Sequence, residues 1–171
     1  MRVNIEELNF RSEADVARVQ EILSRGFAKP PWNIRQASLG WSHVVKSWRS
    51  PGTKVYIAKQ RGKIVGVSAG QINHSAITPT KVLAKLGEGK HYYLDMTAVD
   101  QRKLRKGVAL ALHLAHEENA RGEKCTAIFG ETHPKSRRVI GLFTKQGFRR
   151  FHADEAANHV YYKKELKQKR G

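Results

Sequence analysis

The stretch at residues 94–109 reads LDMTAVDQRKLRKGVA. It predicts a strand that ends at Val99, a basic polar turn, and an apolar helix that opens at Gly107. The first N–H groups of a helix have no partner within it, and the helix dipole favours anions there. Because Gly107 and Ala109 remove side-chain bulk, a phosphate can approach the main chain closely. The stretch therefore predicts an anion-binding turn, and the alternative is a basic helix start on a solvated surface.

Strand and helix patterns alternate through the second half of the chain. The elements expected there are a strand at 91–99, a helix at 105–120, a strand at 124–130, a helix at 136–146, and strands at 148–151 and 159–164. A strand–helix–strand unit implies two parallel neighbours joined by a right-handed crossover. The last two strands predict an antiparallel closing pair. This half therefore predicts a mixed sheet of the α/β class.

The first half of the chain predicts helices followed by a hairpin. The elements expected there are a strand at 3–8, a helix at 12–26, a helix at 38–50, hairpin strands at 54–59 and 63–70, and a loop at 72–89 with room for one short helix at 81–86. Ser12 and Asp15 resemble a capping box at the start of the first helix. The two hairpin strands flank a short turn and are the strongest local signal in the sequence.

Length and composition indicate a single domain. A chain of 171 residues, of which 40% are hydrophobic, suits one domain with its own core. We expect no membrane span, because no run of about 18 apolar residues occurs, and we see no signal-peptide stretch. The lone Cys125 cannot form an internal disulfide and is expected to fill the core of a cytoplasmic protein.

The positive charge is unevenly spread along the chain. The formal net charge is +17, and no Asp or Glu occurs between Glu21 and Glu88. This acid-free stretch holds all three tryptophans, Trp32, Trp41 and Trp48. Such a field attracts polyanions and repels small polycations. It indicates either a face for an anionic partner or an ordinary solvated surface.

Two motifs resemble the GNAT superfamily of N-acetyltransferases, and the resemblance covers about residues 1–165. That family has a strand ending near Leu-Ala-Val, followed by Arg/Gln-x-x-Gly-x-Gly/Ala at the start of a helix. Thr97-Ala98-Val99 and the eight-residue step from Val99 to Gly107 fit this pattern. A second family motif, Leu-Tyr-x-x-x-Gly-Phe, is matched by LFTKQGF at 142–148. We therefore expect a GNAT domain over residues 1–165 and a basic tail over 166–171.

The resemblance implies a mixed α+β fold with a defined cofactor site. The expected GNAT fold has a central mixed sheet of six to seven strands, about four helices, and parallel fourth and fifth strands that splay apart. Acetyl-CoA would enter this gap, with its pantetheine arm pairing with the backbone like an added strand and one backbone N–H polarising the thioester carbonyl. The residues expected at the cofactor are Thr97, Ala98, Val99, Arg102, Lys103, Leu104, Arg105, Lys106, Gly107, Val108, Ala109, Ser136 and Phe143.

The mechanism implied by the resemblance is direct attack of an acceptor amine on the thioester. An amine with a pKa of about 8 to 10 is mostly protonated at neutral pH, so a base must take its proton. Asp95 is the first candidate, because many family members carry a carboxylate four residues before the position of Val99. Side-chain alternation predicts that Asp95, Thr97 and Val99 share one face of the strand. Glu131 and His133 are second candidates, and a structural role is the alternative for each carboxylate.

Three positions depart from the family pattern. Leu104 stands at the Arg/Gln position of the first motif, and Ser136 replaces a frequent asparagine. Phe143 stands where the family usually has a tyrosine that protonates the departing thiolate. Tyr161 or Tyr162 could replace that tyrosine, or CoA could leave as the thiolate; packing is the alternative role for both tyrosines. These departures also leave open a non-catalytic CoA- or RNA-binding module on the same fold.

The acceptor is expected to contact the acid-free stretch, because the family's first two helices border the acceptor pocket. Trp32 and Trp41 are the candidate contacts. A cationic rim with stacking rings suits an anionic or nucleic-acid-associated amine, such as an aminoacyl-tRNA or a protein on a ribosome. The alternative is that the tryptophans pack the helices onto the sheet. No metal is expected, since His113 and His116 lack a third ligand, and a homodimer remains open.

Overall fold

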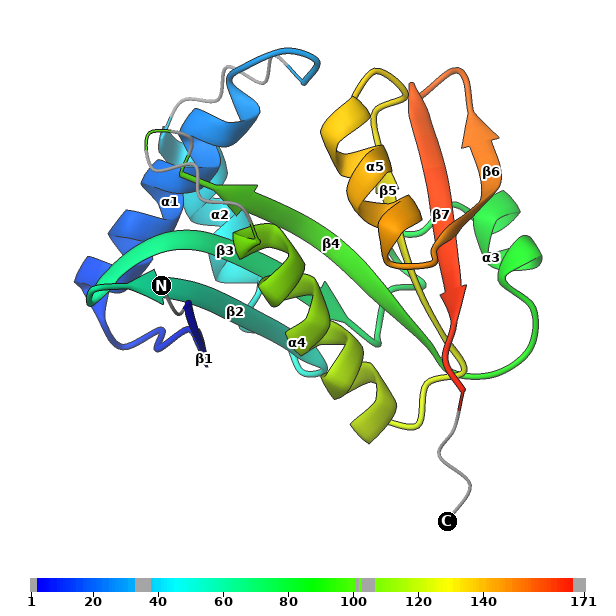
Figure 1. Ribbon diagram of the computed structural model, residues 1–171, viewed down its shortest axis with the longest axis horizontal. Helices are drawn as coiled ribbons and strands as arrows, with labels where there is room; N and C mark the ends of the chain where they lie inside the picture. Colours follow the sequence, from blue (N-terminus) through cyan, green and yellow to red (C-terminus); the bar gives the residue numbers. More distant parts are fainter. Residues whose placement is uncertain (1–2, 33–37, 101, 103–106, 168–171) are drawn as a thin grey trace. The chain divides into compact units, whose positions relative to one another are not determined.

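The computed structural model describes residues 3–32, 38–100, 102 and 107–167. The elements are β1 (Asn4–Glu7), α1 (Glu13–Phe27), α2 (Ser38–Ser47), β2 (Thr53–Gln60), β3 (Lys63–Gln71), α3 (Thr80–Leu86), β4 (His91–Val99), α4 (Val108–Gly122), β5 (Ala127–Thr132), α5 (Arg137–Lys145), β6 (Arg149–Asp154) and β7 (His159–Glu165) (Figure 1). The chain divides into two compact units. The first comprises Met1–Gly70 and Met96–His116, and the second comprises Gln71–Asp95 and Glu117–Gly171.

In the first unit the strand order is β1-β2-β3-β4. Strands β1 and β2 are antiparallel, with Asn4 opposite Lys59 and Glu7 opposite Tyr56. Strands β2 and β3 form the predicted hairpin. Its turn uses the left-handed region at Arg61 and at Gly62, with φ of 48° and 71°. Two such residues match the right-handed twist of the strands they join, which explains the position of the glycine.

Two apolar clusters cover the faces of β2 and β3 in the first unit. Val55 and Ile57 point to the cluster that contains the buried residues of α1 and α2, including Trp41. Tyr56 and Ala58 point the other way, to the cluster that contains Val108 and Leu112 of the first turns of α4. This alternation is the two-residue period of a strand. Helix α1 begins as predicted, because the Ser12 side chain accepts a hydrogen bond of 3.2 Å from the backbone N–H of Asp15.

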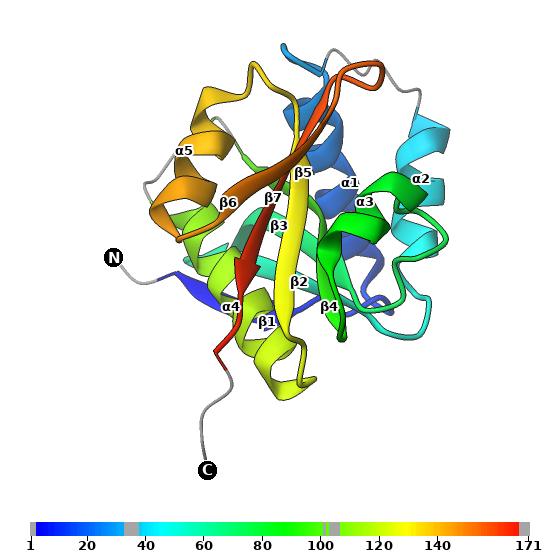
Figure 2. The ribbon, with the colours of Figure 1, turned by 90° about the vertical axis from the view of Figure 1, so that its right-hand side faces the viewer.

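In the second unit the strand order is β4-β5-β7-β6. Strands β4 and β5 are parallel, with a register that runs from His91 opposite Ala127 to Leu94 opposite Gly130. Strand β7 is antiparallel to both β5 and β6. Helix α5 lies on one side of β5 and β7 and α3 lies on the other (Figure 2). Each helix packs on its own buried cluster.

The predicted α/β class and the parallel fourth and fifth strands are confirmed. The sheet has seven strands in the order β1-β2-β3-β4-β5-β7-β6, within the six to seven expected. The described residues contain five helices, one more than the expected four. Strand β5 begins at Ala127 rather than at 124, because Lys124 has a φ of 57° and turns the chain first. The splaying of the two parallel strands and the division at residue 165 stay predictions.

Candidate active-site elements

The first unit carries the turn that follows β4. Gly107 has a φ of 97°, and a Cβ built on it would meet no atom of the described residues within 4 Å. That conformation is strained for any residue with a side chain, so it explains the glycine. Helix α4 begins at the next residue, Val108. Among the described residues, no side chain or backbone atom occupies the Cβ position of Gly107, where the sequence predicts close approach of a phosphate. Four of the predicted cofactor residues, Lys103, Leu104, Arg105 and Lys106, lie outside the described residues.

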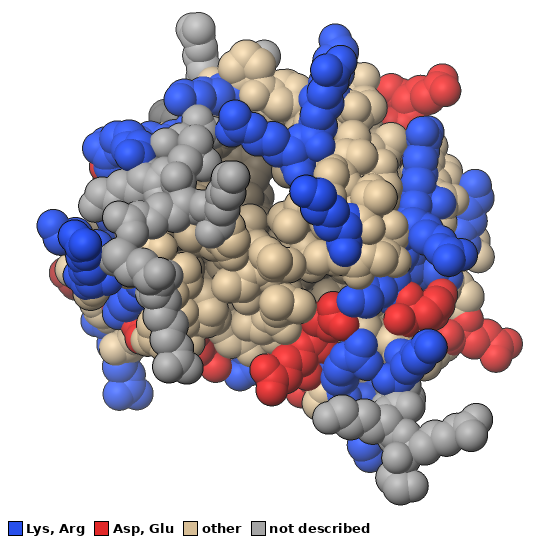
Figure 3. All heavy atoms as spheres, viewed as in Figure 1, with Lys and Arg blue, Asp and Glu red and all other residues tan. Residues whose placement is uncertain are grey.

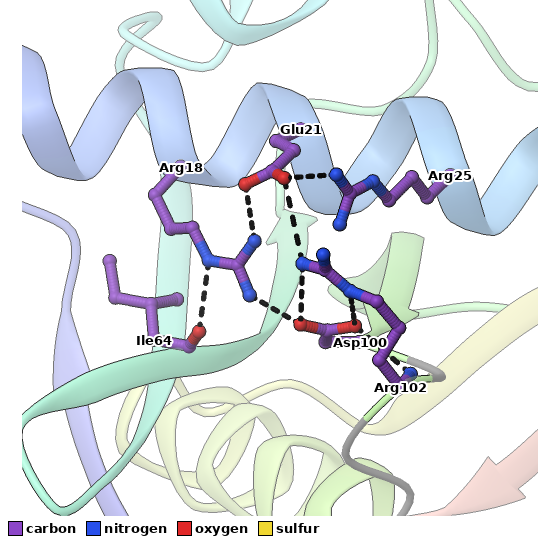
Figure 4. A network of polar contacts seen from close by, with 6 residues as sticks. All are labelled: Arg18, Glu21, Arg25, Ile64, Asp100 and Arg102. Atoms are coloured by element: carbon purple, nitrogen blue, oxygen red, sulfur yellow. Dashed lines mark hydrogen bonds and ion pairs between the residues drawn. The ribbon is translucent and has the colours of Figure 1, made fainter.

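Arg102 takes part in an ion-pair network rather than being an unpaired cation (Figure 4). Its Nε atom lies 3.3 Å from Oδ1 of Asp100, and its Nη2 atom lies 3.5 Å from Oε1 of Glu21. Arg18 of α1 binds the same two carboxylates. Burial by itself would raise the pKa of Asp100, but hydrogen bonds from Arg102 and Arg18 prevail and lower it to about 2. Asp100 is therefore ionised at neutral pH, and Arg102 shares the carboxylates of Asp100 and Glu21 with Arg18 and Arg25.

The side chains at the end of β4 make hydrogen bonds and apolar contacts within the first unit. The hydroxyl of Thr97 lies 2.7 Å from Oγ of Ser68 and 3.2 Å from Nε2 of His113. Ala98 is buried in the cluster beneath α1 and α2, and Val99 packs on the cluster beneath α4. A role of these three residues at the cofactor would therefore fall to their main chain, which agrees with the backbone pairing expected from the sequence.

The second unit gathers polar side chains around Glu131, near the end of β5. The hydroxyls of Tyr93 and Tyr161 both hydrogen-bond to Glu131. Nδ1 of His159 lies 3.3 Å from Oε2 of the same carboxylate. Burial raises the pKa of both tyrosines, and the negative charge of Glu131 raises it further. The charge of Asp95 also raises the pKa of Tyr93. Both tyrosines therefore keep their protons at neutral pH and donate them to hydrogen bonds.

The sequence suggested Asp95, Glu131 and Tyr161 as candidates but not Tyr93 and His159, which contact the same carboxylate of Glu131. The available signal was strand alternation. Tyr93 lies two residues before Asp95, and His159 lies two residues before Tyr161, so each pair falls on one face of its strand where the strand is regular. His133 lies in the loop after β5, where its Nδ1 accepts a 3.1 Å hydrogen bond from the backbone N–H of Lys135.

Phe143 and Tyr162 pack in the core of the second unit. Their rings stack with centroids 5.4 Å apart and an interplanar angle of 18°. Phe148 lies beside Phe143, with ring centroids 4.9 Å apart. The packing role is thus confirmed for Tyr162, which points to the α5 side of the sheet, whereas Tyr161 points to the α3 side. Ser136 precedes α5 and is buried, and its side chain makes no capping hydrogen bond.

The tryptophans of the acid-free stretch differ in their surroundings. Trp41 is 2% exposed and belongs to the core cluster of the first unit. A buried ring cannot stack on a base from solvent, so the packing interpretation holds for Trp41. Trp32 is half-buried, and its ring centroid lies 5.9 Å from that of Phe27. Trp32 therefore stays a candidate acceptor contact.

The histidines of α4 are also engaged in the fold. His113 contacts Thr97, and His116 is fully buried with its ring centroid 4.8 Å from that of Tyr56. Within the part of the chain that the structure describes, no group of three or more His, Cys, Asp or Glu side chains could hold a metal ion. Over the same residues, no helix has the length and apolar character needed to cross a membrane.

Comparison with known proteins gives the family. The sequence model of the Acetyltransferase (GNAT) family matches residues 16–148, whereas no curated protein matches the chain. The fold is similar to that of PH1933 from Pyrococcus horikoshii OT3, with a TM-score of 0.77, 18% identity, and 97% of this chain and 99% of that chain covered. It is also similar to the ribosomal-protein-S18-alanine N-acetyltransferase from Escherichia coli, with a TM-score of 0.68, 14% identity, and 99% and 98% covered.

A third similar structure is the PaiA N-acetyltransferase from Thermoplasma acidophilum in complex with coenzyme A. The TM-score is 0.67 and the identity 13%, with 97% of this chain and 100% of that chain covered. At such identities the structural likeness shows the fold alone, and the sequence model shows the family. The family match favours an enzyme over a non-catalytic module. The chain belongs to the GNAT family of acetyltransferases, whose cofactor is acetyl-CoA.

Proposed function

We propose that this acetyltransferase transfers an acetyl group from acetyl-CoA to a primary amine, with Glu131 as the proton acceptor. The amine nitrogen attacks the thioester carbonyl carbon, and the carbon–sulfur bond then breaks. CoA leaves as a thiolate, and the proton of the amine passes to Glu131. The observation that carries this assignment is the set of contacts that hold the Glu131 carboxylate, from Tyr93, Tyr161 and His159. A base acts efficiently only when its position is fixed.

Glu131 replaces Asp95 as the first candidate base. Two tyrosine hydroxyls hold the carboxylate of Glu131 in place, and Asp95 acts on the same cluster through its charge on Tyr93. The test compares Glu131→Gln with Asp95→Asn, each an isosteric loss of charge. We expect Glu131→Gln to lower kcat by about 100-fold, since a general base contributes about 10² to 10⁴. CoA affinity should be unchanged. If Glu131→Gln kept the wild-type kcat and Asp95→Asn lost most of it, Asp95 rather than Glu131 would be the general base.

We place the pyrophosphate of acetyl-CoA on residues 102–109. The support is the open main chain at Gly107 and the helix that begins after it. Gly107→Glu should abolish CoA binding, because it adds bulk and negative charge at this point. Gly62→Glu is the matched control, since Gly62 also has a positive φ and open space around it but lies in the β2–β3 turn. Calorimetric titration with CoA checks both variants, and retained affinity in folded Gly107→Glu would disprove the placement.

The acceptor is proposed to be an amine on an anionic or nucleic-acid-associated molecule. The net charge of +17 supports this, and Figure 3 shows Lys and Arg side chains over much of the face drawn. Release of CoA thiol from acetyl-CoA should be faster with amines carried on RNA or on acidic molecules than with a polyamine of equal concentration. Added salt should reduce this preference, because it screens exposed charges. Equal rates for both classes at low salt would contradict the proposal.

A further inference from the structure

Asp100 lies at the centre of a charge network within the first unit (Figure 4). The network joins α1 to the residues that follow β4. Arg18 of α1 binds Asp100 and Glu21, and its Nε donates a 3.2 Å hydrogen bond to the carbonyl oxygen of Ile64 in β3. Arg102 binds the same two carboxylates from the other side. Through Arg18, the Asp100 carboxylate is thus linked to α1 and to β3, which both lie far from it in sequence.

The main chain is part of this network. The backbone N–H of Asp100 donates to the carbonyl oxygen of Val65 at 2.8 Å, which holds the residue against β3. The backbone N–H of Arg102 donates to Oδ1 of Asp100 at 3.1 Å. This local bond between residues i and i+2 is the pattern of an Asx turn. It ties the backbone of Arg102 to the side chain of Asp100.

The exposed fraction of the side chains increases from the centre of the network to its outer residue. The side chain of Asp100 is 2% exposed, that of Arg18 is 23% exposed, and that of Arg102 is 58% exposed. A buried carboxylate needs a charged partner and hydrogen bonds. Arg18 supplies the inner partner, which leaves Arg102 as the outer one. Arg18 therefore fixes the position of Asp100, and Asp100 in turn holds the more exposed Arg102.

We propose that Asp100 is a positioning residue for acetyl-CoA binding. Anchored by Arg18, it holds both the main chain and the guanidinium of Arg102, the first residue of the pyrophosphate-binding turn. This inference rests on the placement of the pyrophosphate proposed above. A turn whose start is already ordered loses less conformational entropy when it binds a ligand. Loss of the Asp100 carboxylate should therefore weaken cofactor binding without altering the chemical step.

A second consequence concerns the role of Arg102. Its guanidinium shares Asp100 and Glu21 with Arg18 and Arg25, so three arginines surround two carboxylates and the network carries one net positive charge. Removing Arg102 therefore removes both an ordered contact and a positive charge, and should raise the Kd for CoA. Removing the Asp100 carboxylate makes the network more positive, so a raised Kd in that variant reports lost positioning rather than lost attraction for phosphate.

The experiment measures the Kd for CoA by calorimetry and steady-state kinetics with an amine acceptor. We expect Asp100→Asn to raise the Kd for CoA and the KM for acetyl-CoA by about tenfold, a free-energy change of about 1.4 kcal/mol. The kcat at saturating acetyl-CoA and the KM for the acceptor should stay within about twofold of wild type. Arg25→Gln is the matched control, because Arg25 also pairs with Glu21 and its described ion pair does not involve Asp100. It should leave all these constants unchanged.

A second variant keeps the proposal testable if Asp100→Asn does not fold. Arg102→Gln changes an exposed side chain and leaves the Arg18–Asp100 pair intact. It should raise the Kd for CoA by about threefold to tenfold. Wild-type affinity in both folded variants would overturn the positioning role. Gly107→Glu distinguishes a failure of the pyrophosphate placement from a failure of the positioning role of Asp100. If it loses CoA affinity and Asp100→Asn does not, only the role of Asp100 fails.

Discussion

The Nε2 atom of His113 lies 3.2 Å from the hydroxyl oxygen of Thr97, inside the first unit. Burial lowers the pKa of His113 to about 4. It also lowers the pKa of His116, one helical turn later, to about 3, with a further contribution from the nearby His113. Both imidazoles are therefore neutral in the folded protein at physiological pH. In the unfolded chain each would titrate near its ordinary value, about 6.5.

Stability should consequently fall as the pH is lowered from about 6.5 toward 4. The folded pKa values are below the unfolded ones, so the unfolded chain binds more protons in this window. Each histidine then removes about 1.4 kcal/mol of stability per pH unit. Urea unfolding at pH 7.5 and pH 5 measures the effect. His113→Gln should reduce the difference between the two pH values, whereas His43→Gln, on α2, should not. An equal pH difference in wild type and His113→Gln would contradict the burial argument.

Trp41 and Trp32 should differ sharply when truncated. Trp41→Ala should lower the free energy of unfolding by about 3 to 5 kcal/mol, because it empties a buried site in the core. Trp32→Ala should cost about 1 kcal/mol or less, since the ring is half-buried. If Trp32 contacts the acceptor, its loss should raise the KM for the acceptor and leave that for acetyl-CoA unchanged. Chemical denaturation and kinetics on both variants test the two roles.

Gly130 and Gly141 form a matched pair for testing packing in the second unit. A Cβ at Gly130 would lie 3.1 Å from Cζ of Phe143 and 3.3 Å from the carbonyl oxygen of Leu94. Gly130→Ala should therefore destabilise the fold by about 1 to 3 kcal/mol through overpacking. A Cβ at Gly141 on α5 would meet nothing within 4 Å, so Gly141→Ala should stabilise it by about 0.5 to 1 kcal/mol. Thermal unfolding measures the stability of both variants. A Gly130→Ala variant more stable than Gly141→Ala would contradict this description of the packing.

Tyr161 and Tyr162 test the two faces of β7. Tyr161→Phe removes a hydrogen bond to Glu131, so kcat should fall by about tenfold and the pH profile of kcat should shift. Tyr162→Phe keeps the ring that stacks on Phe143 and should leave kcat within about twofold. Steady-state rates across pH 6 to 9 compare the variants. Equal effects on kcat would show that the hydroxyl of Tyr161 does not support the base.

Local signals predicted the elements well where one short segment decides the structure. The β2–β3 hairpin and the cap at Ser12 were both predicted, because a turn or a cap depends on a few neighbouring residues. The start of β5 was placed three residues too early. Lys124 adopts a left-handed conformation there, which an apolar pattern does not reveal.

The partners of the candidate site residues were much harder to predict. Asp100 and Arg18 are 82 positions apart in sequence, and no pattern in either segment predicts that they pair. The same holds for Glu131, whose tyrosine partners come from β4 and β7. Arg102 was expected at the cofactor as part of a basic turn, and only the fold shows that two carboxylates hold it.

The sequence by itself determined the family and the order of the elements, since these depend on short motifs and on periodicity along the chain. The tertiary structure decided which charges are already paired, which tryptophan is buried, and which tyrosine of the adjacent pair reaches a carboxylate. Those outcomes depend on strand register and on helices packed from distant segments. The neighbours of a single charge or ring are fixed only when these segments pack together, so the local sequence does not specify them.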